Sequence, residues 1–153
     1  MKILIGKEYV PTICELIKNA KSNIKILMYH WGYYARQNDI PAQKITNALI
    51  ASQHKGISVQ VLLHCGSPGD NLKQKNLETH NNLRARNIDC KFYKSSGTMH
   101  AKLVIIDNQI AIVGSHNFSR KSFQNNIEIS TMVDDIEDIQ RLKKYYDIIW
   151  SQI

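Results

Sequence analysis

Two residues that can handle a phosphate, His100 and Lys102, stand two positions apart in the sequence. They lead into an apolar run, Leu103 to Ile106, which is typical of a buried β-strand. A strand sends residues i and i+2 to the same face, so the imidazole and the ammonium point into one pocket. A strand histidine is more often structural and a lysine is usually solvated. Beside so apolar a strand, however, a buried lysine is best explained by a bound anion.

A second polar group, Gly114-Ser115-His116-Asn117, begins seven positions after Asp107. The apolar runs on either side of Asp107 predict two strands joined by a tight hairpin, and antiparallel pairing then brings the second group beside the first. Asn117 can donate to a phosphate oxygen, and Ser115 can position another side chain. Taken separately, Ser115 and Asn117 are more simply interpreted as turn formers or helix caps. Asp107 alone is more simply interpreted as part of an Asx turn.

Glu128 lies in a further predicted strand, Asn126 to Val133. A carboxylate that binds one nitrogen of His100 would fix the tautomer of the ring, so Glu128 is a candidate for that role. Considered without the other motif residues, Glu128 is more simply interpreted as an exposed charged residue on a strand.

Helices and strands alternate through the rest of the chain. Helical spacing of apolar residues predicts helices over 7–21, 41–55 and 72–86, and each precedes a predicted strand, at 24–28, 57–63 and 89–93. A last helix carries an apolar stripe from Ile136 to Trp150 and has acidic residues at its start. This order predicts an α/β fold with a mixed β-sheet flanked by helices on both faces. At 153 residues and 43% hydrophobic composition, we expect a single domain over 1–153.

Charge and cysteine content indicate which binding partners and which cellular compartment to expect. The net charge of +7 favours polyanionic partners without identifying them. Part of the excess is local, because residues 91–121 hold five Lys or Arg, including Arg120 and Lys121, against one acidic residue. These two are candidate substrate contacts. Three cysteines with no C-x-x-C pair indicate a reducing cytoplasm. No signal peptide or membrane anchor is evident, so we expect a cytoplasmic location and no stable membrane association.

Two loops fall where strands end, which is where open α/β sheets bind ligands. The loop over residues 29–39 is aromatic, and its Trp31 can stack on a base, although such clusters more often pack a loop or an interface. The loop over residues 64–75 contains glycines and Lys73, and it can form a phosphate-facing flap. A plain solvated connection is the simpler interpretation of this second loop.

The complete pattern, H-x-K-x4-D-x6-G-S-x-N, resembles the signature of the phospholipase D superfamily. Its fixed positions are occupied here by His100, Lys102, Asp107, Gly114, Ser115 and Asn117. The segment Asn126-Ile127-Glu128 is similar to the family's downstream N-x-E element, and Tyr146 to Trp150 is similar to its closing aromatic helix. The resemblance implies a phospholipase D-like sandwich in which the motif residues and Glu128 form the catalytic set.

Most members of that family carry two such motifs, but no other histidine of this chain has a lysine two residues later. The chain thus most resembles single-motif nucleases, in which two identical subunits each supply half of the site. The resemblance implies a homodimer in which His100 attacks phosphorus to form a phosphohistidine, while the partner subunit's His100 protonates the leaving oxygen. Lys102 and Asn117 would hold the non-bridging oxygens, so neither a metal nor another cofactor is required.

Together, the resemblance and the basic charge predict a metal-independent endonuclease that cleaves DNA, with RNA left open. The rival enzyme is a phospholipase D-type lipid hydrolase or transferase, because the same histidine chemistry acts on any phosphodiester. A catalytically silent nucleic-acid-binding module is the non-enzymatic alternative. The intact motif counts against it, since a binding protein needs no nucleophile.

Overall fold

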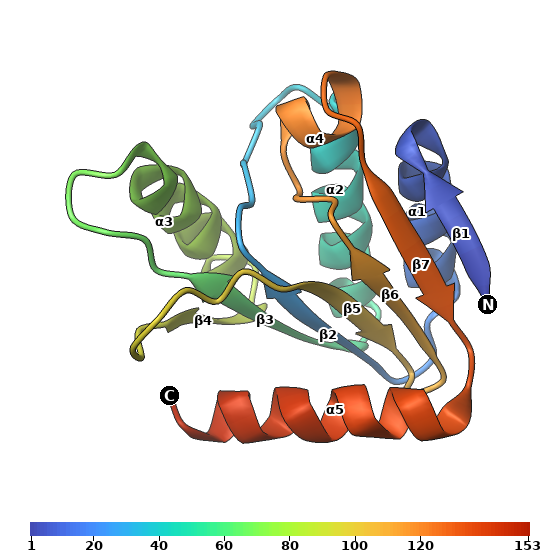
Figure 1. The fold of residues 1–153 in the computed structure, drawn as a ribbon. Coiled ribbons are helices and arrows are strands. Elements are labelled where there is room, and N and C mark those ends of the chain that lie inside the picture. The colour runs from blue at the N-terminus through green and yellow to red at the C-terminus, as the bar shows by residue number, and fades with distance from the viewer.

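The computed structural model describes all 153 residues and contains one seven-stranded sheet (Figure 1). Its strands are β1 (Lys2–Ile5), β2 (Asn23–Met28), β3 (Ser58–His64), β4 (Asp89–Tyr93), β5 (Lys102–Ile106), β6 (Ile110–Gly114) and β7 (Ile129–Val133). Its helices are α1 (Tyr9–Asn19), α2 (Pro41–His54), α3 (Asn71–Arg84), α4 (Arg120–Gln124) and α5 (Ile136–Ser151), with a short 3-10 turn, η1 (Gly6–Glu8).

The sheet is mixed, as predicted, with the strand order β1-β7-β6-β5-β2-β3-β4. Strands β2, β3 and β4 run parallel because α2 and α3 return the chain between them. The remaining pairs are antiparallel. The hairpin between β5 and β6 turns at Asp107 and Asn108, whose φ angles are 54° and 55°. Positive φ at both central residues is the requirement of a type I′ turn, which Asp and Asn tolerate.

Helices cover both faces of the sheet, and each face has its own core. On one face, α1, α2 and α3 pack on the strands in a cluster of 24 buried residues. On the other face, α5 packs alone, through Ile139, Tyr146 and Ile149, on β2, β3, β5 and β6. Figure 1 shows α5 below the sheet, on the side opposite α1, α2 and α3. None of the helices is both long and apolar enough to cross a bilayer.

Two elements were not expected from the sequence, and one predicted strand was too long. The edge strand β1 has four residues, three of them exposed, so it lacks the apolar run of a buried strand. Helix α4 has five residues, too few for a periodic pattern. Strand β7 begins at Ile129 rather than at Asn126, because Asn126 and Glu128 form side-chain hydrogen bonds in the preceding loop.

Asp107 ties the hairpin to the start of β2. Its carboxylate accepts hydrogen bonds from the backbone N–H groups of Lys21, Ser22 and Asn23 and from the Ser22 hydroxyl, at 2.7 to 3.1 Å. Burial alone would raise the pKa of Asp107, but these hydrogen bonds outweigh it and lower the pKa. The ionised carboxylate therefore stabilises the fold.

We expect Asp107→Ala to lower the free energy of unfolding by about 2 kcal/mol at pH 7, because several donors lose a charged acceptor. A lowered folded-state pKa means that this contribution is present above the unfolded pKa of about 3.9 and is lost as the pH falls through the folded value. Urea unfolding at pH 7 and at decreasing pH measures the difference. Asp39→Ala is the control, since Asp39 is exposed and makes no side-chain hydrogen bond. An undiminished difference at pH 2 would contradict this account.

Candidate active site

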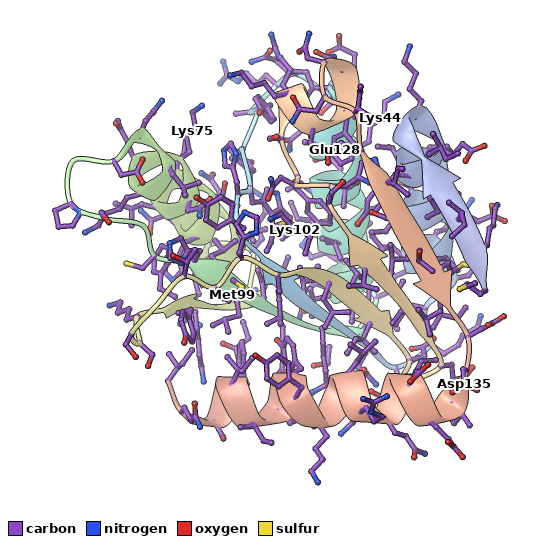
Figure 2. All side chains as sticks on the ribbon, viewed as in Figure 1. Lys44, Lys75, Met99, Lys102, Glu128 and Asp135 are labelled. Carbon is purple, nitrogen blue, oxygen red and sulfur yellow. The ribbon has the colours of Figure 1, made fainter.

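An open cleft lies where β5 begins and β6 ends. It has a volume of about 480 Å³, and most of the predicted site residues line it: His100, Lys102, Gly114, Ser115, Asn117 and Glu128, together with Ala101 and Val113. Antiparallel pairing of Leu103 with Val113 brings the two motifs together, as predicted. In Figure 2, Lys102 and Glu128 lie at this end of the sheet, whereas Asp135 lies at the other end, at the start of α5.

Lys102 is a buried cation that forms no salt bridge. Its side chain is only 7% exposed, and no carboxylate lies within 4.0 Å of its ammonium. The Nζ atom donates to the His100 carbonyl at 2.7 Å and lies 4.9 Å from the centre of the Tyr29 ring. Burial lowers the pKa of Lys102, and the negative charge of Glu128, which lines the same cleft, opposes this shift only in part. An ammonium held in this way is suited to binding a substrate anion.

His100 lies beside this ammonium and is exposed to the cleft. Each of its ring nitrogens is 3.1 Å from Lys102 Nζ, and its ring centre is 4.5 Å from that of Tyr29. Burial against these neighbours and the charge of Lys102 both lower the pKa of His100. The imidazole is therefore neutral at pH 7, which leaves a ring nitrogen able to act as a nucleophile.

Asn117 is held so that its amide can donate into the cleft. Its Oδ1 atom accepts from His30 N–H at 3.2 Å, and its own N–H donates to the Ser122 hydroxyl at 2.9 Å. With Oδ1 engaged, the amide nitrogen makes no hydrogen bond within the chain. Asn117 and Lys102 thus present free donors to the same space.

Glu128 does not contact His100, and this expectation was wrong. The Glu128 carboxylate instead accepts hydrogen bonds from the hydroxyls of Ser115 and Ser122 and from the Asn126 amide. Burial would raise the pKa of Glu128, but these hydrogen bonds together lower it. Because Ser122 also accepts from Asn117 N–H, Glu128 positions Asn117 through one intervening hydroxyl.

Gly114 is required by the close approach of β6 and β7. A Cβ atom at this position would overlap the backbone and side chain of Ser130, the residue paired with it. Ser130 in turn binds His116 Nδ1 at 2.7 Å, while His116 Nε2 lies 3.1 Å from the Gly6 carbonyl. His116 is fully buried and stacks on Tyr9, so it is a structural residue that fixes β1 and η1 to the site.

Two other predicted site residues are excluded from the cleft. Asp107 lies at the opposite end of β5 from Lys102, because the strand separates them, and its carboxylate is occupied by Lys21, Ser22 and Asn23. Trp31 is fully buried, and its Nε1 donates to Thr46 at 3.0 Å, so its ring cannot stack on a base. Both have structural roles.

The three remaining basic candidates lie outside the cleft lining. Arg120 and Lys121 are exposed on α4, where Arg120 Nη2 donates to Gln37 Oε1 at 3.0 Å. Lys73 lies in the first turns of α3 and lines a neighbouring cavity. Contacts of these residues with a substrate stay a prediction.

Sequence reasoning missed two residues that shape the site. Tyr29 packs against His100 on one side and stacks on His64 on the other, at 5.2 Å between ring centres. Asn76, fully buried on α3, donates to the carbonyls of Tyr29 and His64 and accepts from Trp31 N–H. Tyr29 carries a positional signal, since it directly follows a buried strand. Asn76 carries none, because a polar helix residue is ordinarily exposed.

The groups that face the cleft suit an anion better than a cation. They are an ammonium, an amide and an imidazole, and the carboxylate of Glu128 is already engaged by its three donors. No three His, Cys, Asp or Glu side chains of the chain are grouped closely enough to hold a metal ion.

Curated relatives of the chain carry lipid-enzyme names. It is 39% identical over 93 residues to a phospholipase D of Rickettsia conorii, an alignment that covers 61% of this chain and 44% of the relative. It is 29% identical over 147 residues to the mitochondrial cardiolipin hydrolase of Canis lupus familiaris, covering 96% of this chain and 52% of that protein. The chain thus spans about half the length of these relatives.

Two solved structures share the fold over nearly their full length. Nuc from Salmonella typhimurium, a phospholipase D family member, matches with a TM-score of 0.81 at 18% identity, covering 99% of this chain and 95% of Nuc. NucT from Helicobacter pylori matches with a TM-score of 0.76 at 23% identity, covering 98% and 94%. The family model of the cardiolipin synthase PLD-like domain matches residues 13–150, which include every residue of the cleft. The chain therefore belongs to the phospholipase D superfamily.

Proposed function

We propose that this chain is a metal-independent phosphodiesterase that cleaves nucleic acid through a phosphohistidine at a homodimer interface. The observation that carries the proposal is the buried Lys102 ammonium, which has no carboxylate partner and faces the cleft beside the free Asn117 amide and the exposed His100. These three groups match the needs of a phosphodiester: two donors for its non-bridging oxygens and one nucleophile for its phosphorus.

In the proposed reaction, a ring nitrogen of neutral His100 attacks phosphorus, and the bond from phosphorus to the leaving oxygen breaks. Lys102 and Asn117 donate to the non-bridging oxygens and stabilise the charge of the transition state. A protonated imidazole must supply the leaving oxygen with a proton, and a water molecule then displaces His100. The cleft of one chain contains a single imidazole, His100. We therefore propose that the second imidazole comes from another chain.

The sheet offers a surface for that second chain. On the face of the sheet that carries α5, three adjacent strands expose apolar side chains that α5 does not cover. These are Ile3, Ile5, Ile129 and Val113. We call these residues, with the 97% exposed Ile127, the apolar strip. Val113 also lines the catalytic cleft, so the strip is continuous with the site. Burying the strip against a second copy would bring two His100 side chains towards a common two-fold axis.

Nucleic acid is the preferred substrate because of the charge of the chain and the extent of its alignment with known proteins. A net charge of +7 suits a polyphosphate backbone. The structural alignments cover nearly all of Nuc and NucT, whereas the sequence alignments cover only 44% and 52% of the phospholipase D and the cardiolipin hydrolase to which the chain is similar. The names of those relatives make a phospholipid the second candidate substrate. Assays that offer single-stranded DNA, duplex DNA, RNA and cardiolipin vesicles in parallel distinguish the two classes.

We expect His100→Ala to reduce cleavage by about three orders of magnitude or more, because it removes both the nucleophile and the proton donor. Cleavage of a labelled oligonucleotide measures the loss, with light scattering to show that the variant keeps its oligomeric state. His54→Ala, at an exposed helix position, is the matched control and should retain full activity. Wild-type cleavage should persist in excess EDTA. Full cleavage by His100→Ala, or a strict dependence of cleavage on added magnesium, would contradict the proposed function.

We expect Ile127→Asp to convert the protein to monomers and to abolish cleavage at the same protein concentrations, because a buried charge opposes closure of the apolar strip. Analytical ultracentrifugation alongside the cleavage assay measures both effects. Ile136→Asp, at an exposed position at the start of α5, is the control and should change neither. Full activity from a monomer would show that one chain suffices.

A further inference from the structure

A second cavity lies next to the catalytic cleft, on the side of His100 that faces α3. Its volume is about 560 Å³, and it lies between the end of β3, the first turns of α3 and the segment that follows β4. This size falls within the range of small-ligand sites. Apart from a predicted contact at Lys73, the proposed reaction assigns it no role.

The cavity and the cleft are neighbours. Thr98, in the cavity wall, precedes His100 by two residues. His64 also lines the cavity, and a single aromatic ring, that of Tyr29, separates its ring from that of His100. Asn76 binds the carbonyls of both Tyr29 and His64, so this spacing is fixed by the fold. A ligand in the cavity therefore lies beside whatever His100 attacks.

The lining is positively charged and partly aromatic. It contains Lys73 and Lys94 but no carboxylate, and neither lysine forms a salt bridge. Tyr93 also lines the cavity, and its aromatic side chain is half-buried against the core beneath α5, with its hydroxyl donating to the Ser96 carbonyl at 3.3 Å. Leu77, 45% exposed, adds an apolar edge. Cations beside an aromatic ring are the combination that binds a phosphate together with a base.

The walls are preformed rather than loose. Gly66, in the loop after β3, packs so closely on α3 that a Cβ atom at this position would lie 3.0 Å from Lys73 Cβ. Asp70 caps the same helix by accepting from Leu72 N–H at 2.9 Å. These contacts fix the loop and the helix that carry one side of the cavity.

We propose that this cavity binds the nucleotide next to the scissile phosphate of a single-stranded nucleic acid. Lys73 and Lys94 contact its phosphate, and its base lies against Tyr93 and Leu77. A base inside a duplex is paired and stacked and cannot enter such a cavity, so the cavity selects single strands. This inference rests on the proposed function, which it deepens by naming the form of the substrate.

The test measures binding separately from cleavage. In the His100→Ala background, fluorescence anisotropy gives the Kd for a labelled twelve-nucleotide oligothymidylate and for its duplex with oligodeoxyadenylate. Tyr93→Ala should weaken binding of the single strand about fivefold or more, whereas Tyr93→Phe, which keeps the ring, should not. Lys73→Ala and Lys94→Ala each remove one cation from the phosphate, so each should reduce the salt slope of log K by about 0.7. Lys144→Ala, an exposed lysine of α5, is the control for charge alone.

Leu77→Asp gives a second variant at an exposed position, should Tyr93→Ala impair folding, and it should also weaken single-strand binding. The duplex should bind more weakly than the single strand and should not respond to Tyr93→Ala. Equal losses for duplex and single strand, or no loss in any variant, would overturn the inference. Binding of cardiolipin vesicles at the cavity, without binding of the oligonucleotide there, would also overturn it. Tyr93-dependent binding by a wild-type protein that cleaves no oligonucleotide would instead overturn the proposed function and leave the cavity assignment intact.

Discussion

The site depends on one electrostatic constraint: the Lys102 ammonium is buried at the end of the sheet and forms no salt bridge. Removing a charge from water is costly, and the His100 carbonyl and the Tyr29 ring compensate only in part. Burial lowers the pKa of His100, and the charge of Lys102 lowers it further, so the neutral imidazole is favoured. A substrate phosphate would supply the missing anion. In the proposed function, one buried cation thus both binds the substrate and prepares the nucleophile.

Two buried polar side chains hold the rest of the site around this cation. Glu128 accepts hydrogen bonds from the hydroxyls of Ser115 and Ser122 and so fixes the loop that carries Asn117. Asn76 joins the ends of β2 and β3 and so fixes the rings beside His100. Buried hydrogen-bond networks of this kind are costly when incomplete, which is why they specify one geometry. The groups that face the cleft can therefore keep free donors while their neighbours are fully engaged.

The sequence was sufficient for most of the architecture and for the centre of the site. Apolar residues at helical and strand spacing predicted the helices and the mixed sheet. The two-residue spacing predicted that His100 and Lys102 lie together, as they do, although β5 begins at Lys102 and His100 precedes the strand. Burial and long-range contacts could not be predicted in the same way. Asp107 stands at a fixed motif position, yet its partners are backbone groups more than 80 residues away. Trp31 appears as part of an aromatic loop, and only tertiary packing shows that it is buried.

The central claim is that two chains build one site in which a single His100 becomes phosphorylated. Rapid mixing with a labelled oligonucleotide, quenching in alkali and intact-mass spectrometry with peptide mapping measure the intermediate directly. The account predicts a covalent nucleotide adduct on His100, with one adduct for every two chains. An adduct on another residue, adducts on both chains of a dimer at once, or turnover with no adduct at any time would contradict it.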